Sequence, residues 1–219
     1  MKTWLRETTL PVKVQALAAA CSRIQHRTDE KGPGYRDIAL LALAWGNLGY
    51  AAGFSYLKHI GERVRGTSGP ILECGSGATT LLIAALTADR DAEFVVLEHD
   101  LTWYEYLKRV LDALGYSHVN LVYAPLSDYG AYRWYQVPAS GVPGEIRLVI
   151  CDGPPGSIQG GRYGLMPVMK DSLADDCVIL LDDTHRKEER RIVDVWGECR
   201  CLKANRIGRF GTHAEVEFC

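Results

Sequence analysis

The sequence lacks a strong net charge of either sign. Its 219 residues include 25 lysines and arginines and 27 aspartates and glutamates, which gives a formal net charge of −2 at pH 7. A protein that binds the phosphates of DNA or RNA usually carries a clear excess of positive charge. We therefore expect no nucleic-acid partner and a small-molecule substrate instead.

The chain also lacks the cysteine patterns of a disulfide framework or a zinc site. Its seven cysteines are scattered, and Cys74, Cys151 and Cys177 lie in or beside apolar runs, where a buried free thiol is common. Cys199 and Cys201 are close in sequence, but no second close pair accompanies them. This usage is typical of a reducing compartment and predicts a cytoplasmic location.

Neither a secretory leader nor a low-complexity segment is expected. The first ten residues, MKTWLRETTL, lack the apolar run of a signal peptide. The segment from Ile38 to Leu57 carries no charge over twenty residues, which is long enough for a membrane span. Gly46, Asn47 and Gly49 instead favour two buried helices with a break between them, so we expect no membrane contact.

What the chain does contain is an alternation of strand and helix signals from Pro70 onward. Short apolar runs end in polar residues or glycine, and they read ILEC, EFVVLEH, NLVYAPL, RLVICDG and CVILLDD. Helical periodicity separates the first three of them, and an amphipathic helix is expected earlier, from Leu10 to Arg27. The final GTHAEVEFC alternates apolar and charged residues, as an antiparallel strand with one buried face does. The pattern predicts an open, mainly parallel sheet covered on both faces.

The segment from Tyr129 to Glu145 has prolines, glycines and aromatic residues without clean periodicity. Two interpretations stay open for it. It is either an irregular segment that faces a substrate or a packed surface loop.

A glycine turn follows the first of the strand-like runs, in the sequence PILECGSGATTLLIA. Gly75 and Gly77 allow a sharp turn from strand to helix and let a ligand approach the backbone N–H groups at the helix start. Glu98 closes the second run 23 residues after Gly75, where a carboxylate can accept both hydroxyls of a ribose. These features predict nucleoside binding.

The dinucleotide fingerprint requires a third glycine, and the chain has Thr80 at that position. The segment ECGSGATT instead resembles the E/D-x-G-x-G loop of the class I S-adenosylmethionine-dependent methyltransferases, and the resemblance covers about residues 70–219. It implies an α/β fold: a Rossmann-like, doubly wound, mainly parallel seven-stranded sheet with an antiparallel last strand. An N-terminal helical extension (1–68) would precede the cofactor-binding domain (69–219).

The resemblance also implies roles for particular residues. Glu73, Gly75 and Gly77 would surround the methionine part of S-adenosylmethionine, and Glu98 would hold its ribose. His99 would lie beside the adenine, and Leu126 would help to cover it. The full predicted cofactor set is Glu73, Gly75, Ser76, Gly77, Thr79, Glu98, His99, Leu126 and Asp152.

Acidic residues end the fourth and fifth apolar runs. Asp152, Asp182 and Asp183 should converge at one edge of the sheet, and three carboxylates suit a hard cation such as Mg²⁺. The arrangement is similar to that of the catechol O-methyltransferase group, in which such acids bind magnesium and two substrate oxygens. That group has a lysine base where this chain has Pro155. The alternative is that Asp152 orients the cofactor or substrate while Asp182 and Asp183 cap the next helix.

The predicted catalytic set is Asp152, Asp183 and His185, with His185 as a replacement for the missing lysine or merely a polar residue at a helix start. Arg162 either grips an anionic substrate group or is an ordinary surface arginine. The run HRKEERR, residues 185–191, is expected to be the solvated face of a helix that buries Ile192 and Trp196.

The function that these features favour is methyl transfer to a small-molecule oxygen, with or without a divalent metal. The DGPPG segment lacks the stacking aromatic residue of the D/N-P-P-Y loop, which argues against a flipped base as substrate. Two alternatives remain: an NAD-dependent oxidoreductase and a non-catalytic relative that binds a nucleoside. A homo-oligomer is compatible with the sequence.

Overall fold

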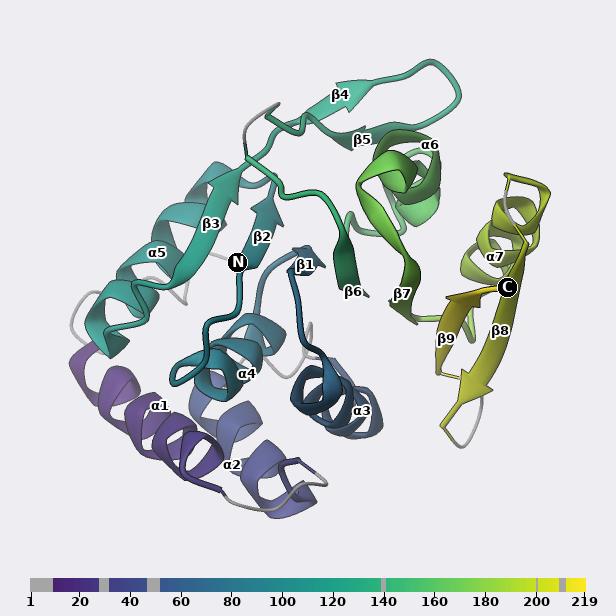
Figure 1. Ribbon diagram of the computed structural model, residues 1–219. Coiled ribbons are helices and arrows are strands. Elements are labelled where there is room, and N and C mark those ends of the chain that lie inside the picture. Colours follow the sequence, from purple (N-terminus) through teal and green to yellow (C-terminus); the bar gives the residue numbers. More distant parts are fainter. Residues whose placement is uncertain (1–9, 28–31, 47–51, 139–140, 200, 209–211) are drawn as a thin grey trace.

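Strands and helices alternate along most of the chain in the computed structural model, which describes residues 10–27, 32–46, 52–138, 141–199, 201–208 and 212–219 (Figure 1). The helices are α1 (Leu10–Gln25), α2 (Tyr35–Trp45), α3 (Phe54–Gly66), α4 (Ala78–Thr87), α5 (Leu101–Leu114), α6 (Leu165–Met169) and α7 (Lys187–Cys199). The strands are β1 (Ile71–Cys74), β2 (Phe94–Glu98), β3 (Val119–Tyr123), β4 (Leu126–Asp128), β5 (Arg133–Tyr135), β6 (Ile146–Cys151), β7 (Leu173–Asp182), β8 (Leu202–Ile207) and β9 (His213–Phe218).

Seven of these strands form one sheet in the order β3-β2-β1-β6-β7-β9-β8. Strand β1 pairs in parallel with β2 and β6, and β6 pairs in parallel with β7. Strand β9 is antiparallel to both of its neighbours, β7 and β8. The predicted mainly parallel sheet with an antiparallel last strand is therefore confirmed.

Both faces of the central strands are buried, because alternate residues of β1, β2, β6 and β7 enter different cores. Ile71, Val96 and Ile150 pack with α1 to α5 on one face. Leu72 and Val149 pack with α6 and α7 on the other face. Burial on both sides explains why the strands read as continuous apolar runs. Figure 1 shows α3 and α4 against the sheet, with α1 and α2 outside them.

The uncharged stretch from Ile38 to Leu57 is divided between two helices. Helix α2 ends at Gly46, which adopts the left-handed conformation (φ 74°) that a glycine favours at a helix end, and α3 begins at Phe54. Asn47 and Gly49 lie outside the described residues. Among the helices that the structure describes, none has both the length and the apolar character needed to cross a membrane.

The segment after β3 contains structure that its sequence did not predict. Strands β4 and β5 form a small antiparallel hairpin, which projects at the top of Figure 1. Trp134 and Tyr135 are fully buried in the core on the α6 side, so this part of the segment is packed. A strand of three residues is too short to show a periodic pattern, so the sequence does not reveal this hairpin. The domain boundary at residue 68, between α3 and β1, stays a prediction.

Candidate functional site

The carboxyl ends of four parallel strands lie along one edge of the sheet. Cys74, at the end of β1, is in register with Leu97 of β2 and with Cys151 of β6. Cys151 is in turn in register with Leu181 of β7. The residues that follow these positions carry the predicted site, so the topology brings the glycine turn, Glu98 and the three aspartates to one edge.

Gly75 is required by the fold itself. Its φ of +86° is left-handed, and a Cβ atom there would lie 2.9 Å from both the Cα and the N of Gly153. The backbone N–H of Gly153 donates to the carbonyl of Cys74 at 2.7 Å, which holds the loops after β1 and β6 in contact. The first glycine of the predicted turn therefore serves close backbone packing.

Gly77 is different, because nothing in the described protein requires a glycine there. Its φ of 173° is extended, and no heavy atom lies within 4 Å of the position that a Cβ would occupy. It directly precedes α4, whose first N–H groups are the kind of donors that would face a ligand at this end of the helix. Open space beside a helix N-terminus fits the predicted contact with a cofactor.

Glu98 is held as an ionised carboxylate at the tip of β2. It accepts hydrogen bonds from the N–H and hydroxyl of Ser76 at 3.2 and 2.6 Å, and from the N–H groups of His99 and Asp100 at 2.7 and 2.8 Å. Burial alone would raise the pKa of Glu98, but these hydrogen bonds and the His99 side chain outweigh it and lower the pKa. Four donors fill the acceptor sites of the carboxylate, and the Ser76 hydroxyl can rotate away to admit a ribose hydroxyl.

Glu73 lies beneath the glycine turn and is fully buried. It accepts a hydrogen bond from the Thr79 hydroxyl, which ties the end of β1 to the first turn of α4. Its second oxygen, Oε2, has no hydrogen-bond partner among the described residues. Burial raises the pKa of Glu73 to about 8, so the carboxyl is largely protonated at neutral pH.

On the predicted adenine side, His99 lies near Tyr135, an aromatic residue of the segment 129–145. The His99 ring lies edge-on to Tyr135, with ring centroids 6.1 Å apart, and Leu126 of β4 is in register with Tyr135 of β5. The buried Tyr135 hydroxyl has no hydrogen-bond partner among the described residues, and it packs against Gly153. The sequence offered Tyr135 only as one of the aromatic residues of a segment that either faces a substrate or packs, because its exact place depends on the hairpin.

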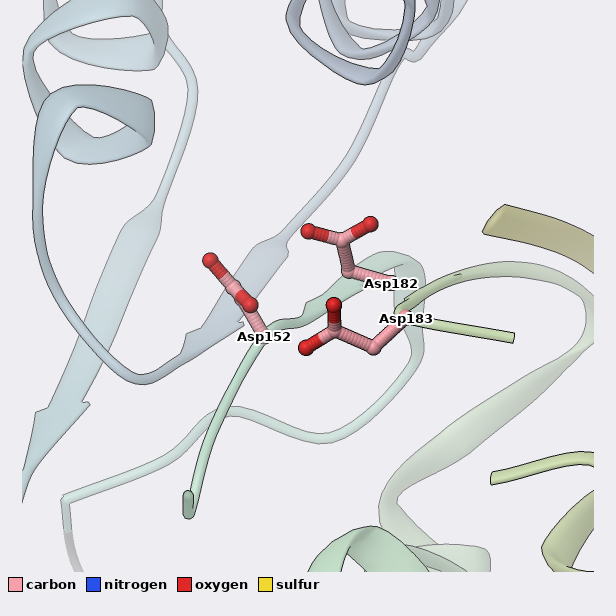
Figure 2. A group of neighbouring side chains, drawn as sticks. All are labelled: Asp152, Asp182 and Asp183. Atoms are coloured by element: carbon pink, nitrogen blue, oxygen red, sulfur yellow. The ribbon is translucent and has the colours of Figure 1, made fainter. Parts of the chain in front are cut away.

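The three aspartates converge as predicted. Figure 2 shows the side chains of Asp152, Asp182 and Asp183 gathered at the ends of β6 and β7, and one oxygen of each lies within 4.8 Å of the others. Burial raises the pKa of Asp152 and of Asp182, and the neighbouring carboxylates add to the rise for Asp182. Asp183 has a left-handed φ of +63°, a strained conformation for a residue other than glycine.

Arg162 joins this cluster, which neither interpretation of it from the sequence anticipated. Its side chain is only 2% exposed, so it is not a surface arginine. Its Nη2 donates to Asp152 Oδ1 at 3.1 Å and to Asp183 Oδ2 at 2.9 Å. Both terminal nitrogens are occupied by protein acceptors, so the guanidinium is not free to grip an anionic substrate group.

The cluster does not fit a magnesium ion as it stands. Mg²⁺ needs carboxylate oxygens at about 2.0–2.1 Å in a near-octahedral arrangement. Here Asp183 Oδ2 already accepts from Arg162 and lies 2.9 Å from Arg186 Nη1, and Asp152 Oδ1 also accepts from Arg162. Guanidinium groups thus occupy oxygens that a metal would need.

His185 precedes α7 with an exposed side chain. Its carbonyl accepts a hydrogen bond from Arg190 at 3.2 Å, and no contact within the described part of the chain joins its imidazole to the three aspartates. Its catalytic role therefore stays a prediction. The run 185–191 is not wholly solvated, because Glu189 is buried and lies 3.5 Å from Arg162 Nη1.

Comparisons with known proteins agree with this architecture. No protein-family model and no curated protein sequence matches the chain. The structure of the Podospora anserina methyltransferase PaMTH1, bound to S-adenosylhomocysteine (SAH), matches with a TM-score of 0.63 and 16% identity over 100% of this chain and 98% of its own.

Two further solved structures match with a TM-score of 0.53. One is a candidate O-methyltransferase of Klebsiella pneumoniae, 14% identical over 94% of this chain and 89% of its own. The other is the METTL16 methyltransferase domain, 13% identical over 99% of this chain and 95% of its own. At these identities the likeness establishes the fold, which is the Rossmann-like fold of S-adenosylmethionine-dependent methyltransferases.

The two glycines of the turn should respond differently to alanine. Gly75→Ala should lower the melting temperature, because the new Cβ would collide with Gly153 and the left-handed φ would be strained. Gly77→Ala should leave the melting temperature nearly unchanged and should weaken S-adenosylhomocysteine binding. Thermal unfolding and calorimetry of both variants check this, and equal destabilisation by the two substitutions would contradict the assignment.

Glu73→Gln should stabilise the protein more at pH 8 than at pH 5. The pKa of Glu73 is about 8 in the folded protein and 4.5 in its ordinary state, so its contribution to stability is greatest below pH 4.5 and is lost as the pH rises toward 8. The neutral amide avoids that loss, which is on the order of 4 kcal/mol at pH 8. Urea unfolding at both pH values tests this against Glu105→Gln on the exposed face of α5; the same shift at both values would contradict it.

Proposed function

We propose that this chain is an S-adenosylmethionine-dependent methyltransferase that methylates an oxygen of a small molecule. One observation carries the proposal: an ionised, buried carboxylate, Glu98, lies beside a glycine turn whose second glycine, Gly77, faces open space. The first feature suits a ribose and the second suits close approach of a ligand to a helix N-terminus. The fold shared with methyltransferases supports the choice of cofactor.

The cofactor would span the edge of the sheet. Its ribose would bind Glu98 after the Ser76 hydroxyl rotates away, and its adenine would lie toward His99 and Leu126. Its methionine part would lie over Gly77, where the N-terminus of α4 favours a carboxylate. The sulfonium would then face the acids at the ends of β6 and β7.

The proposed reaction is an in-line displacement at the methyl carbon. A bond forms from the acceptor oxygen to the methyl group as the carbon–sulfur bond breaks, and that electron pair stays on sulfur. The hydroxyl proton passes to Asp152, whose raised pKa suits a general base and whose side chain is 26% exposed. Because the sulfonium is already activated, most of the acceleration comes from alignment and exclusion of water.

Asp183 would orient the acceptor beside Asp152, and His185 remains a third candidate that would have to turn inward. The acidic cluster suits an acceptor that donates hydrogen bonds, such as a neutral hydroxyl compound, because the partly exposed carboxyl oxygens of Asp152 and Asp183 can accept them. A cytoplasmic location and a homo-oligomeric state stay predictions from the sequence.

The NAD-dependent alternative is less well supported. Thr80 stands at the position of the third fingerprint glycine, is fully buried, and accepts a hydrogen bond from the Gly77 N–H at 2.9 Å. In dinucleotide-binding folds a glycine at this position lets the helix pack closely on the strand. Here the position holds a threonine that caps the helix instead. A non-catalytic relative differs from the proposed enzyme only in turnover.

Glu98→Gln should weaken the binding of S-adenosylmethionine and S-adenosylhomocysteine by about 10- to 100-fold, the loss expected when a charged hydrogen-bond acceptor becomes neutral. Calorimetry with both ligands and with NAD measures this, and Glu105→Gln is the matched surface control. Tight binding of NAD together with no binding of the other two ligands would refute the proposed function.

Asp152→Asn should lower kcat for methyl transfer by about 100-fold or more, since it removes the proposed proton acceptor. Transfer of a labelled methyl group to a panel of small hydroxyl compounds identifies the activity. Calorimetry with S-adenosylhomocysteine reports whether the variant still binds the cofactor. A folded Asp152→Asn variant with the kcat of the native protein would show that the base lies elsewhere.

A further inference from the structure

Arg162 occupies the centre of the carboxylate cluster and touches both strand ends. Nη2 donates to the carbonyl of Asp152 at 2.7 Å in addition to Asp152 Oδ1 and Asp183 Oδ2. Nη1 donates to the carbonyl of Asp182 at 2.9 Å and lies 3.5 Å from Glu189 Oε1. The one guanidinium therefore ties together β6, β7 and α7.

The chain around Arg162 is built to keep the side chain there. Arg162 belongs to a short 3-10 helix, Gly161–Gly164, that follows Gly160. A Cβ on Gly160 would collide with Tyr132, and a Cβ on Gly164 would lie 2.6 Å from Trp134. The segment thus packs tightly on the β4–β5 hairpin and directs Arg162 under the edge of the sheet, away from solvent.

Charge explains why the arginine stays in this position. Three acidic side chains, those of Asp152, Asp183 and Glu189, form ion pairs here, and their partners among the described residues are Arg162, which is buried, and Arg186, which is 47% exposed. Burial alone would lower the pKa of Arg162, but the neighbouring acids outweigh it and raise the pKa, so the guanidinium remains charged. A buried cation with this many carboxylate and carbonyl partners would leave them uncompensated if it were withdrawn.

We infer that Arg162 is the resident cation of this site and takes the place that a divalent metal would otherwise have between Asp152 and Asp183. The protein then binds no Mg²⁺ or Mn²⁺ in the cluster. The methyl acceptor donates hydrogen bonds to the exposed parts of Asp152 and Asp183. It does not need two adjacent oxygens, because it chelates no metal ion. The statement about the acceptor rests on the proposed function, whereas the statement about metal does not.

The direct test is to measure Mn²⁺ binding by electron paramagnetic resonance, which needs neither cofactor nor activity. The native protein should leave Mn²⁺ free at concentrations up to about 1 mM, the weak end of carboxylate cation sites. Arg162→Gln removes the guanidinium and should gain one Mn²⁺ site. The double variant Arg162→Gln/Asp152→Asn should lose that Mn²⁺ site again, because Asp152 is one of its carboxylates.

Arg186→Gln is the matched control, because Arg186 also contacts Asp183 Oδ2 but from the exposed side. It should not gain a Mn²⁺ site. Tight Mn²⁺ binding by the native protein that Asp152→Asn abolishes would overturn the inference, whether or not Arg162→Gln folds. A folded Arg162→Gln variant that fails to bind Mn²⁺ would also overturn it. Failure of the proposed function appears separately, as absence of S-adenosylhomocysteine binding in calorimetry.

Discussion

The contact between Gly75 and Gly153 is the constraint on which the rest of the site depends. Two backbone loops, after the adjacent parallel strands β1 and β6, meet where neither chain carries a Cβ. The N–H groups of Asp152 and Gly153 both donate to the carbonyl of Cys74, at 3.1 and 2.7 Å. This contact fixes the distance between the glycine turn and the acidic cluster, so a ligand in the turn lies next to Asp152.

The buried acidic groups along the carboxyl edge of the sheet are stabilised in two different ways. Glu98 is ionised because four N–H and O–H donors surround it, and one of them, the Ser76 hydroxyl, can rotate away to admit a ribose hydroxyl. The acids at the ends of β6 and β7 are balanced instead by Arg162, which the protein supplies from its own chain. The proposed cofactor end and the proposed catalytic end of the site thus have separate electrostatic supports, linked by the shared backbone contact.

Much of this arrangement could be predicted from local patterns. The glycine turn and Glu98 lie at the ends of apolar runs, and strand ends in a parallel sheet converge by topology alone. The buried role of Arg162 could not be predicted this way, because its segment has no periodicity and its partners come from two other strand ends and a helix. Glu189 belongs to a run of charged residues that looks solvated in the sequence. In the structure it is buried beside Arg162. Tyr135 depends on a hairpin whose strands are too short to show a pattern.

A crystal structure of the protein with S-adenosylhomocysteine tests the central claim most directly. The account predicts the ribose hydroxyls on Glu98 with the Ser76 hydroxyl turned aside, the amino-acid part over Gly77, and the sulfur facing Asp152 beside an undisturbed Arg162. A ligand bound at another place, or a sugar that does not touch Glu98, would contradict the account.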